Sequence, residues 1–172
     1  MRKNKGLRLI LILAIIAVNI GCDQLSKKIV REKLYPQVQL RYWGDHLMIT
    51  RVENTGAFLS AGDNIGGYAR VLFLAVLPMA ALIGAMVHVV KNYRMDWLRL
   101  TAICCILGGG FGNIYDRIAN GSVTDFLYLE FGIFKTGIFN LADVSITTGV
   151  ILLLIVLNKP YFMKNSESNM EG

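Results

Sequence analysis

Two aspartates, Asp125 and Asp143, are the residues of this sequence best suited to acid–base chemistry. Asp143 lies within an otherwise apolar segment, Ile138–Leu157. An ionisable side chain inside a membrane span costs about 2.5–3.5 kcal/mol on insertion scales, which makes it a candidate functional residue. Asp125 lies 18 positions earlier, in the loop before this segment. If that loop folds back, the two carboxyl groups can share one proton and activate a water molecule for attack on a carbonyl carbon.

Each aspartate also has a structural explanation that involves no catalysis. Asn140 suits the N-cap position of a helix, and Asp143 follows three residues later, where the helix dipole favours a carboxylate. Asp125, in the sequence Ser122-Val-Thr-Asp-Phe126, suits a turn or the end of a strand. A cap can hold a carboxylate in its ionised form, so capping and catalysis are compatible.

Three polar residues close the glycine-rich segment Gly108–Gly112. Asn113, Asp116 and Arg117 are spaced i, i+3 and i+4, so they share one face of a helix. This spacing points Asn113 and Arg117 toward a common polar site, and the alternative is an ion pair at the helix end. The glycines themselves favour close packing between membrane helices.

Weaker candidates lie earlier in the chain. Asp23 and Lys27 are spaced i and i+4, so they can pair on one helix. Asn54 can hydrogen-bond a peptide, and Gly56 permits close backbone approach. A serine–lysine protease using Ser26 and Lys27 is disfavoured, because adjacent residues on a helix point in different directions. A transporter with Asp116 and Asp143 on an ion pathway is the rival from another functional class.

The composition indicates a membrane protein. The chain has 172 residues, of which 54% are hydrophobic and only 17% charged, against about 25% charged in soluble domains. Four apolar stretches reach the roughly 20 residues needed to span a bilayer. They are Leu7–Ser26, Tyr68–Val90, Trp97–Tyr115 and Ile138–Leu157. Pro78, inside the second stretch, predicts a tolerated kink.

The polar segments between these spans predict a small β-structure on the membrane surface. Gln37–Tyr42 and His46–Val52 look like short strands around the turn Trp43-Gly44-Asp45. The segment from 116 to 137 is predicted as a loop that carries acids. We therefore expect one integral membrane domain over residues 1–164 and a disordered polar tail over residues 165–172.

The charge pattern bears on partners and on orientation. The net charge is +6, but the basic residues flank the apolar segments instead of forming a stripe, so nucleic acid is not expected as a partner. With four spans both termini lie on one side, and the basic residues then divide nine against nine. One side holds Arg2, Lys3, Lys5, Arg8, Lys91, Arg94, Arg99, Lys159 and Lys164, and the other holds Lys27, Lys28, Arg31, Lys33, Arg41, Arg51, Arg70, Arg117 and Lys135. The basic N-terminus favours termini inside.

The cysteines and histidines carry no clear function of their own. Cys22, Cys104 and Cys105 form no disulfide framework, and His46 and His88 stand alone, so no metal site and no cofactor are expected. The N-terminus through Gly21-Cys22 resembles a lipoprotein signal with a cysteine to be lipidated. Asn19 argues against that alternative, since an aliphatic residue belongs three positions before such a cysteine.

Five motifs in order resemble one family. They are Asp23-Gln-x-Ser-Lys27, Asn54-x-Gly-Ala57, Gly109-x-x-Gly-Asn113-x-x-Asp-Arg117, Val123-x-Asp-Phe126 and Phe139-Asn-x-Ala-Asp143. Their placement around four spans resembles the lipoprotein signal peptidases (signal peptidase II), which are bacterial aspartic proteases of the cytoplasmic membrane. The resemblance extends from about residue 7 to residue 158.

The resemblance implies an all-α membrane fold of four transmembrane helices with a small extracytoplasmic β-sheet cradle. It implies an aspartic endopeptidase that cuts a prolipoprotein just before its diacylglyceryl-modified cysteine, on the outer side of the membrane, with both termini cytoplasmic. Membrane lipid is then a further partner, and we expect a monomer. The family's catalytic aspartates fall on Asp125 and Asp143. The residues expected to bind substrate or shape the site are Asp23, Lys27, Asn54, Gly56, Asn113, Asp116, Arg117 and Asn140.

Overall fold

Four long apolar helices form the body of the molecule in a computed structural model, which describes residues 5–56 and 67–168. Each is long and apolar enough to cross a membrane: α1 (Lys5–Lys33), the helical segment Leu72–Lys91, α4 (Trp97–Asn120) and the first part of α5 (Leu141–Ser168). The four predicted spans are confirmed. Several helices continue beyond the apolar stretch, because polar residues of α1 and α4 extend the same helices past the predicted ends.

The second span is built from three pieces instead of one kinked helix. A short helix, α2 (Gly67–Val71), leads into a π-helical segment, η2 (Leu72–Val76), and then into α3 (Leu77–Lys91). The N–H of Leu77 bonds to the carbonyl oxygen of Leu72, five residues back. Pro78 follows at the start of α3, where its missing N–H costs little. The predicted disturbance at Pro78 therefore takes the form of a π segment.

A four-stranded antiparallel sheet of order β1-β2-β3-β4 stands at one end of the helices. Its strands are β1 (Gln39–Tyr42), β2 (Leu47–Asn54), β3 (Val123–Phe131) and β4 (Phe134–Lys135). The first two strands and their turn were predicted, and the turn has positive φ at Trp43, Gly44 and Asp45. The prediction of a loop from 116 to 137 was wrong: α4 continues to Asn120, and β3 pairs with β2 some 70 residues away.

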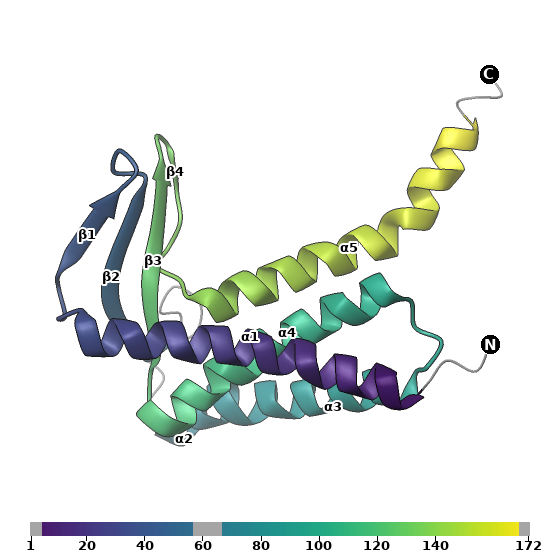
Figure 1. The fold of residues 1–172 in the computed structure, drawn as a ribbon, viewed down its shortest axis with the longest axis horizontal. Coiled ribbons are helices and arrows are strands. Elements are labelled where there is room, and N and C mark those ends of the chain that lie inside the picture. The colour runs from purple at the N-terminus through teal and green to yellow at the C-terminus, as the bar shows by residue number, and fades with distance from the viewer. Residues whose placement is uncertain (1–4, 57–66, 169–172) are drawn as a thin grey trace.

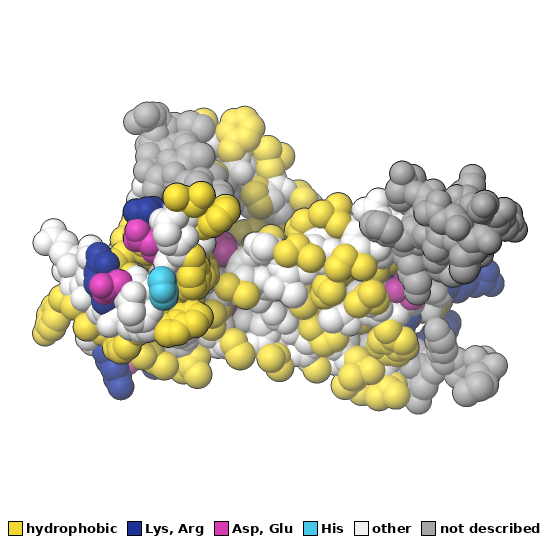
Figure 2. Space-filling view, turned by 90° about the horizontal axis from the view of Figure 1, so that it is seen from above, with side chains coloured by type: hydrophobic (Ala, Val, Ile, Leu, Met, Phe, Trp, Pro, Cys, Tyr) yellow, Lys and Arg dark blue, Asp and Glu magenta, His cyan; other side chains and the backbone are white. Residues whose placement is uncertain are grey.

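The ends of the bundle differ in character. Figure 1 shows the sheet at one end, while the start of α1 and the far end of α5 lie at the other. In Figure 2 the middle of the bundle is covered mainly by hydrophobic side chains, and Lys, Arg, Asp and Glu gather toward the ends. A band of this kind is expected where lipid tails replace water.

Helix α4 is the central helix of the bundle. Half of its apolar window is buried inside the protein, against 11–17% for the other three spans. Small residues allow α5 to approach it closely. A Cβ built on Gly149 of α5 would lie 2.5 Å from the carbonyl oxygen of Ala102, and one on Gly109 of α4 would meet the carbonyl oxygen of Ala142. The helix interface predicted from the glycines of α4 is confirmed.

At the end away from the sheet, Arg8 fastens α1 to the connection between α3 and α4. Its guanidinium Nη1 donates to the carbonyl oxygens of Tyr93 and Met95, both at 3.1 Å, and Nη2 donates to that of Asn92 at 3.1 Å. Asn92 is the C-cap residue of α3, and Tyr93 and Met95 lie in the connection that follows, so Arg8 bonds carbonyls of the connection itself. Arg8 is 6% exposed, so the contact is internal.

The predicted tail lies at the edge of what the structure describes. Helix α5 continues to Ser168, which includes the first residues of the predicted tail. Residues 169–172 lie outside the described residues. The boundary at residue 164 therefore stays a prediction.

Candidate active site

The two aspartates line one cavity of about 340 Å³ where the sheet meets the helices. Asp125 is on β3, and Asp143 is in the first turn of α5. The cavity walls also include apolar side chains from three helical elements, among them Leu82, Ile106 and Ile146. The connection between the two aspartates folds back as predicted, and it contains the rest of β3 and all of β4.

Asp143 takes part in a reciprocal cap at the start of α5. The N–H of Asp143 donates to Oδ1 of Asn140 at 3.0 Å, and the N–H of Asn140 donates to Oδ2 of Asp143 at 3.1 Å. This is the geometry of a capping box, with Asn140 as the N-cap. The helix dipole stabilises negative charge at this position. The capping interpretation is confirmed, and it leaves Asp143 on the wall of the cavity.

Asp125 is held by two side-chain amides. Asn54 Nδ2 donates to its Oδ2 at 2.9 Å, and Asn140 Nδ2 donates to its Oδ1 at 2.6 Å. Asp125 is 4% exposed. Burial raises the pKa of this carboxyl to about 6; the hydrogen bond from Asn54 opposes the rise, and the charge of Asp143 adds to it. The two carboxyl groups therefore occupy different environments.

Two asparagines connect the carboxyl groups to each other. Asn140 bonds Asp125 through its side chain and Asp143 through its backbone N–H. Asn113 Nδ2 donates to Oδ1 of Asp143 at 2.9 Å, and its own Oδ1 accepts from Asn140 Nδ2 at 3.2 Å. Because the amide of Asn140 both donates and accepts, its orientation is fixed.

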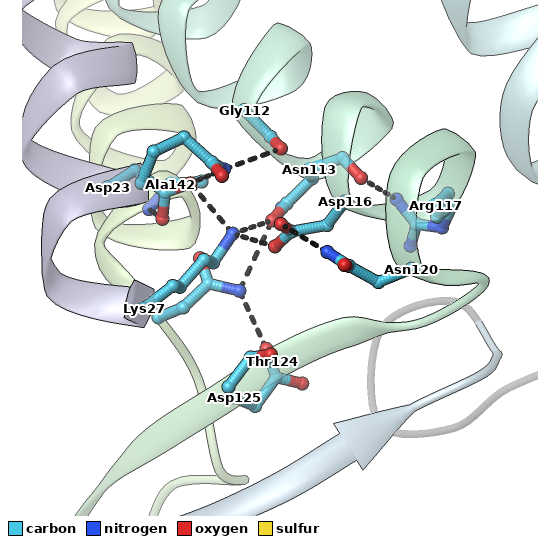
Figure 3. A network of polar contacts seen from close by, with 12 residues as sticks. Asp23, Lys27, Gly112, Asn113, Asp116, Arg117, Asn120, Thr124, Asp125 and Ala142 are labelled. Carbon is cyan, nitrogen blue, oxygen red and sulfur yellow. Dashed lines mark hydrogen bonds and ion pairs between the residues drawn. The ribbon is translucent and has the colours of Figure 1, made fainter. Parts of the chain in front are cut away.

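An ion-pair network of Asp23, Lys27, Arg31 and Asp116 lies beside these amides. Figure 3 shows its buried members Asp23, Lys27 and Asp116. Lys27 Nζ lies 2.7 Å from Asp23 Oδ2 and 2.8 Å from Asp116 Oδ2. It also donates to Asn113 Oδ1 at 2.9 Å. Arg31 Nη2 donates to Asp116 Oδ1 at 2.7 Å. The positive charges of Lys27 and Arg31 balance the negative charges of Asp23 and Asp116. The predicted ion pair of Asp23 and Lys27 is present.

The ion-pair network also fixes the start of α5. Asp23 Oδ1 accepts a hydrogen bond of 2.9 Å from the N–H of Ala142. That N–H is one of the unpaired donors in the first turn of the helix. Asp23 and Asn140 thus cap the same turn, and together they set the position of Asp143.

Arg117 is the cation on the cavity wall among the described lining residues. Its Nη2 donates to the carbonyl oxygen of Gly56 at 3.3 Å, and its Nη1 lies 3.4 Å from the carbonyl oxygen of Asn113. Arg117 and Asn113 therefore face the common polar site that their spacing indicated. Asp116 turns the other way, toward Lys27 and Arg31, as a helix-end ion pair.

The structure bears on the role predicted for Asn54 and on the disfavoured serine–lysine alternative. Asn54 was expected to hydrogen-bond a peptide, but its Nδ2 is bonded to Asp125, and its Oδ1 accepts from the N–H of Gly56 at 3.0 Å. Ser26 Oγ donates to the carbonyl oxygen of Asp23, and Lys27 is enclosed by carboxylates, so they form no nucleophile–base pair. Ala57, in the same motif as Asn54, lies outside the described residues.

Arg31 is the residue of this site that sequence reasoning missed. Besides Asp116, its guanidinium Nε donates to Thr124 Oγ1 at 2.7 Å, next to Asp125 on β3. The available signal was its spacing: Asp23, Lys27 and Arg31 are at i, i+4 and i+8, one stripe of α1. Among the described residues, no three His, Cys, Asp or Glu side chains are placed to hold a metal ion.

A second cavity of about 300 Å³ adjoins the first at Asp143. It is formed by the segment Thr136–Phe139 and by residues of α5 that include Val144 and Thr148. The two cavities share Ile138, Asp143 and Thr147. Asp143 is thus accessible from both.

Comparison with known proteins gives one consistent result. A sequence model described as "Signal peptidase (SPase) II" matches residues 15–159. A lipoprotein signal peptidase of Dichelobacter nodosus is 43% identical over 102 residues, which span 59% of this chain and 65% of that protein. One from Streptococcus pneumoniae is 32% identical over 150 residues, 87% of this chain and 93% of that one. A solved bacterial membrane enzyme superposes with a TM-score of 0.77 at 28% identity, over 87% of this chain and 88% of the other.

Proposed function

Since the chain belongs to the signal peptidase II family, we propose that it cleaves signal peptides from prolipoproteins by an aspartic mechanism centred on Asp125 and Asp143. The observation that carries this mechanism is the shared cavity, with the two carboxyl groups joined through Asn140. The chain is a multi-pass membrane protease in either case, because the family and the four apolar helices establish that much.

The different environments of the two carboxyl groups give one the role of base and the other the role of acid. Asp143, at the N-terminus of α5, is the ionised member and takes a proton from a water molecule, whose oxygen attacks the scissile carbonyl carbon. Asp125, the protonated member, hydrogen-bonds the carbonyl oxygen and stabilises the tetrahedral intermediate. When that intermediate collapses and the C–N bond breaks, the proton held by Asp143 passes to the leaving amine. The raised pKa of Asp125 supports this division.

The surrounding residues position the pair. Asn54, Asn113 and Asn140 donate N–H groups to the carboxyl oxygens, which fixes their directions without adding charge. Each oxygen of Asp125 accepts one such bond. Each oxygen therefore keeps a second lone pair, and one of these can carry the shared proton. Arg117 supplies a positive charge beside the developing oxyanion and holds the backbone at Gly56.

We assign the sheet end of the bundle to the outer side of the membrane and both termini to the cytoplasm. The start of α1 and the far end of α5 both lie at the end of the molecule away from the sheet, as Figure 1 shows. The candidate site is at the sheet end, where an exported precursor arrives. The basic N-terminus supports the same orientation.

Reporter fusions test this orientation. A reporter placed after Lys91 should read cytoplasmic, because Lys91 ends α3 at the end of the bundle away from the sheet. A reporter placed in the turn at Gly44, between β1 and β2, should read external. The measurement is reporter activity in intact cells at matched expression. An external reading after Lys91 would put the candidate site on the wrong side for exported precursors and would refute the assignment.

The substrate's diacylglyceryl group sets the position of the scissile bond. Asp143 is in the first turn of a membrane span, so the site lies at the lipid boundary. The cavity beside it, formed by Thr136–Phe139 and α5, opens off the same carboxylate. Acyl chains in the bilayer contribute about 0.8 kcal/mol per buried CH₂, which anchors a lipidated cysteine at this depth. The enzyme acts as a monomer in contact with membrane lipid.

Turnover of matched precursors tests the proposed function. Purified enzyme in nanodiscs should cleave the lipidated precursor at least about 100-fold faster than the unlipidated one, because orientation contributes several kcal/mol to the barrier. A signal peptide with its cysteine replaced by Ser controls for binding through the signal helix alone. Comparable rates on the lipidated and unlipidated precursors would show that the diacylglyceryl group does not position the scissile bond. No cleavage of either precursor would contradict the proposed function.

A further inference from the structure

A groove of about 600 Å³ runs between α1 and α4 and shares no lining residue with the two cavities at Asp143. Its walls are Ile20, Gln24, Lys28 and Arg31 from α1, and Phe111, Tyr115 and Asn120 from α4. The α1 residues are spaced four, four and three positions apart, so they form one stripe of that helix. The catalytic proposal uses none of these residues except Arg31, whose Nε and Nη2 face the ion-pair network.

The lining changes character along the groove. Ile20 and Phe111 form an apolar floor at the end of the groove farthest from the sheet, and both pack against the buried core. Gln24 and Tyr115 follow, and Lys28, Arg31 and Asn120 line the end nearest the sheet. Ile20 and Lys28 are eight residues apart on α1, which is about 12 Å along the helix axis. The groove therefore matches a phospholipid along its length. Its apolar floor suits an acyl chain, its hydrogen-bonding middle suits the ester groups, and its basic end suits the phosphate.

The basic end has charge available for a ligand. The Lys28 side chain is 69% exposed, and its ion-pair partner Glu32 lies 3.8 Å away and is itself 59% exposed. Arg31 uses Nε and Nη2 on Thr124 and Asp116, which leaves its Nη1 outside these bonds. Lys27, one residue from Lys28, is enclosed by carboxylates instead. Lys28 is therefore a basic residue of the sheet end that the ion-pair network does not explain.

We propose that this groove binds one anionic phospholipid, with the phosphate at Lys28 and Arg31 and one acyl chain along Ile20 and Phe111. Basic pockets between membrane helices bind anionic headgroups in this way. The apolar floor requires a lipid, because a free phosphate ion would leave it empty. Phosphatidylglycerol satisfies both ends of the groove, and a zwitterionic lipid carries no net charge to complement the basic end.

The bound lipid stabilises the sheet–helix junction. Arg31 connects α1 to Asp116 of α4 and to Thr124 of β3. A phosphate on its remaining nitrogen restrains the guanidinium that holds these three elements together. The expected effect is on stability and lipid binding, and it does not depend on which residues carry out catalysis.

The test is lipid binding by the purified full-length enzyme in detergent, followed by native mass spectrometry and thermal unfolding. The probe is phosphatidylglycerol, with phosphatidylcholine of the same acyl chains and inorganic phosphate as comparisons. Lys28→Gln removes the proposed headgroup contact. Lys33→Gln is the matched control, because Lys33 makes the same charge change in the same helix, is exposed and does not line the groove.

We expect wild type and Lys33→Gln to retain one phosphatidylglycerol at least about tenfold more tightly than phosphatidylcholine, and to unfold at a higher temperature with it. Lys28→Gln should lose most of this preference. Equal retention of the two lipids, or an equal loss in Lys28→Gln and Lys33→Gln, would overturn the proposal. The same stabilisation by inorganic phosphate alone would also overturn it, since the apolar floor would then have no role.

Discussion

Asp125→Asn and Asp143→Asn are each expected to slow cleavage of a lipidated precursor by at least about 10³-fold, in a protein that still inserts into the membrane. Proton transfer by a positioned carboxyl group contributes about 10²–10⁴-fold to a rate, and residues that act as a unit fail together. An Asn at either position keeps the size of the side chain and one acceptor oxygen. The folded structure therefore survives while the shared proton is lost.

The control for the dyad is Asp45→Asn, in the turn between β1 and β2. Asp45 pairs loosely with Arg41 at 3.9 Å and is 72% exposed, so its replacement should leave turnover unchanged. The measurement is single-turnover cleavage by purified enzyme, with unfolding temperature recorded for each variant. Near wild-type turnover in either dyad variant would remove that aspartate from the mechanism.

The same assignment fixes the direction of the pH dependence. The free enzyme needs Asp125 protonated, and the pKa of this carboxyl is raised from 3.8 to about 6. Raising the pH through this value removes the proton, so kcat/KM should fall above it, by about tenfold per pH unit well beyond the pKa. A kcat/KM that rises steadily across this range would instead make Asp125 the base.

Lys27→Met is expected to destabilise the protein by about 3–5 kcal/mol, the usual cost when one partner of a buried ion pair is removed. The side chains of Lys27, Asp23 and Asp116 are each 0% exposed. Without Lys27, Asp23 loses its cation, and Asp116 keeps only Arg31. Because Asp23 also caps the N–H of Ala142, the first turn of α5 should loosen as well.

Lys28→Met provides the matched comparison for Lys27→Met. Lys28 is the next residue of the same helix, but its side chain is largely exposed, so its loss should change thermal stability little in detergent without added phosphatidylglycerol. The double variant Lys27→Met with Asp23→Asn should recover part of the loss, since it removes the carboxylate that Lys27→Met leaves without a cation, while Asp116 keeps Arg31. Equal melting temperatures for Lys27→Met and Lys28→Met would show that the ion-pair network does not stabilise the fold.

Local patterns predicted the parts of the site that lie on single helices. The cap formed by Asn140 and Asp143 and the pair of Asp23 and Lys27 depend on spacings of three and four residues, which a sequence displays directly. The four spans follow from length and hydropathy in the same way. The direction of Arg117 toward the cavity follows from its place beside Asn113 on the helix face.

Contacts between distant segments could not be read in this way. Strand β3 carries apolar residues on both faces and pairs with β2 across about 70 residues, so its sequence shows no alternation to separate it from a loop. The bond from Asn54 to Asp125 spans 71 residues, and the bond from Arg31 to Asp116 spans 85. Such partners are determined by the packing of whole elements, which no local spacing records.

The contact between Arg8 and the carbonyl oxygens after α3 has a consequence for the order of assembly. Those carbonyls lie 84–87 residues further along the chain, so they do not exist when α1 leaves the ribosome. The first span therefore enters the bilayer with its guanidinium solvated by water and headgroups. It can dock only after the third span begins to emerge, when Asn92, Tyr93 and Met95 become available. Biogenesis of this protein thus includes a step in which its first helix docks onto segments made much later.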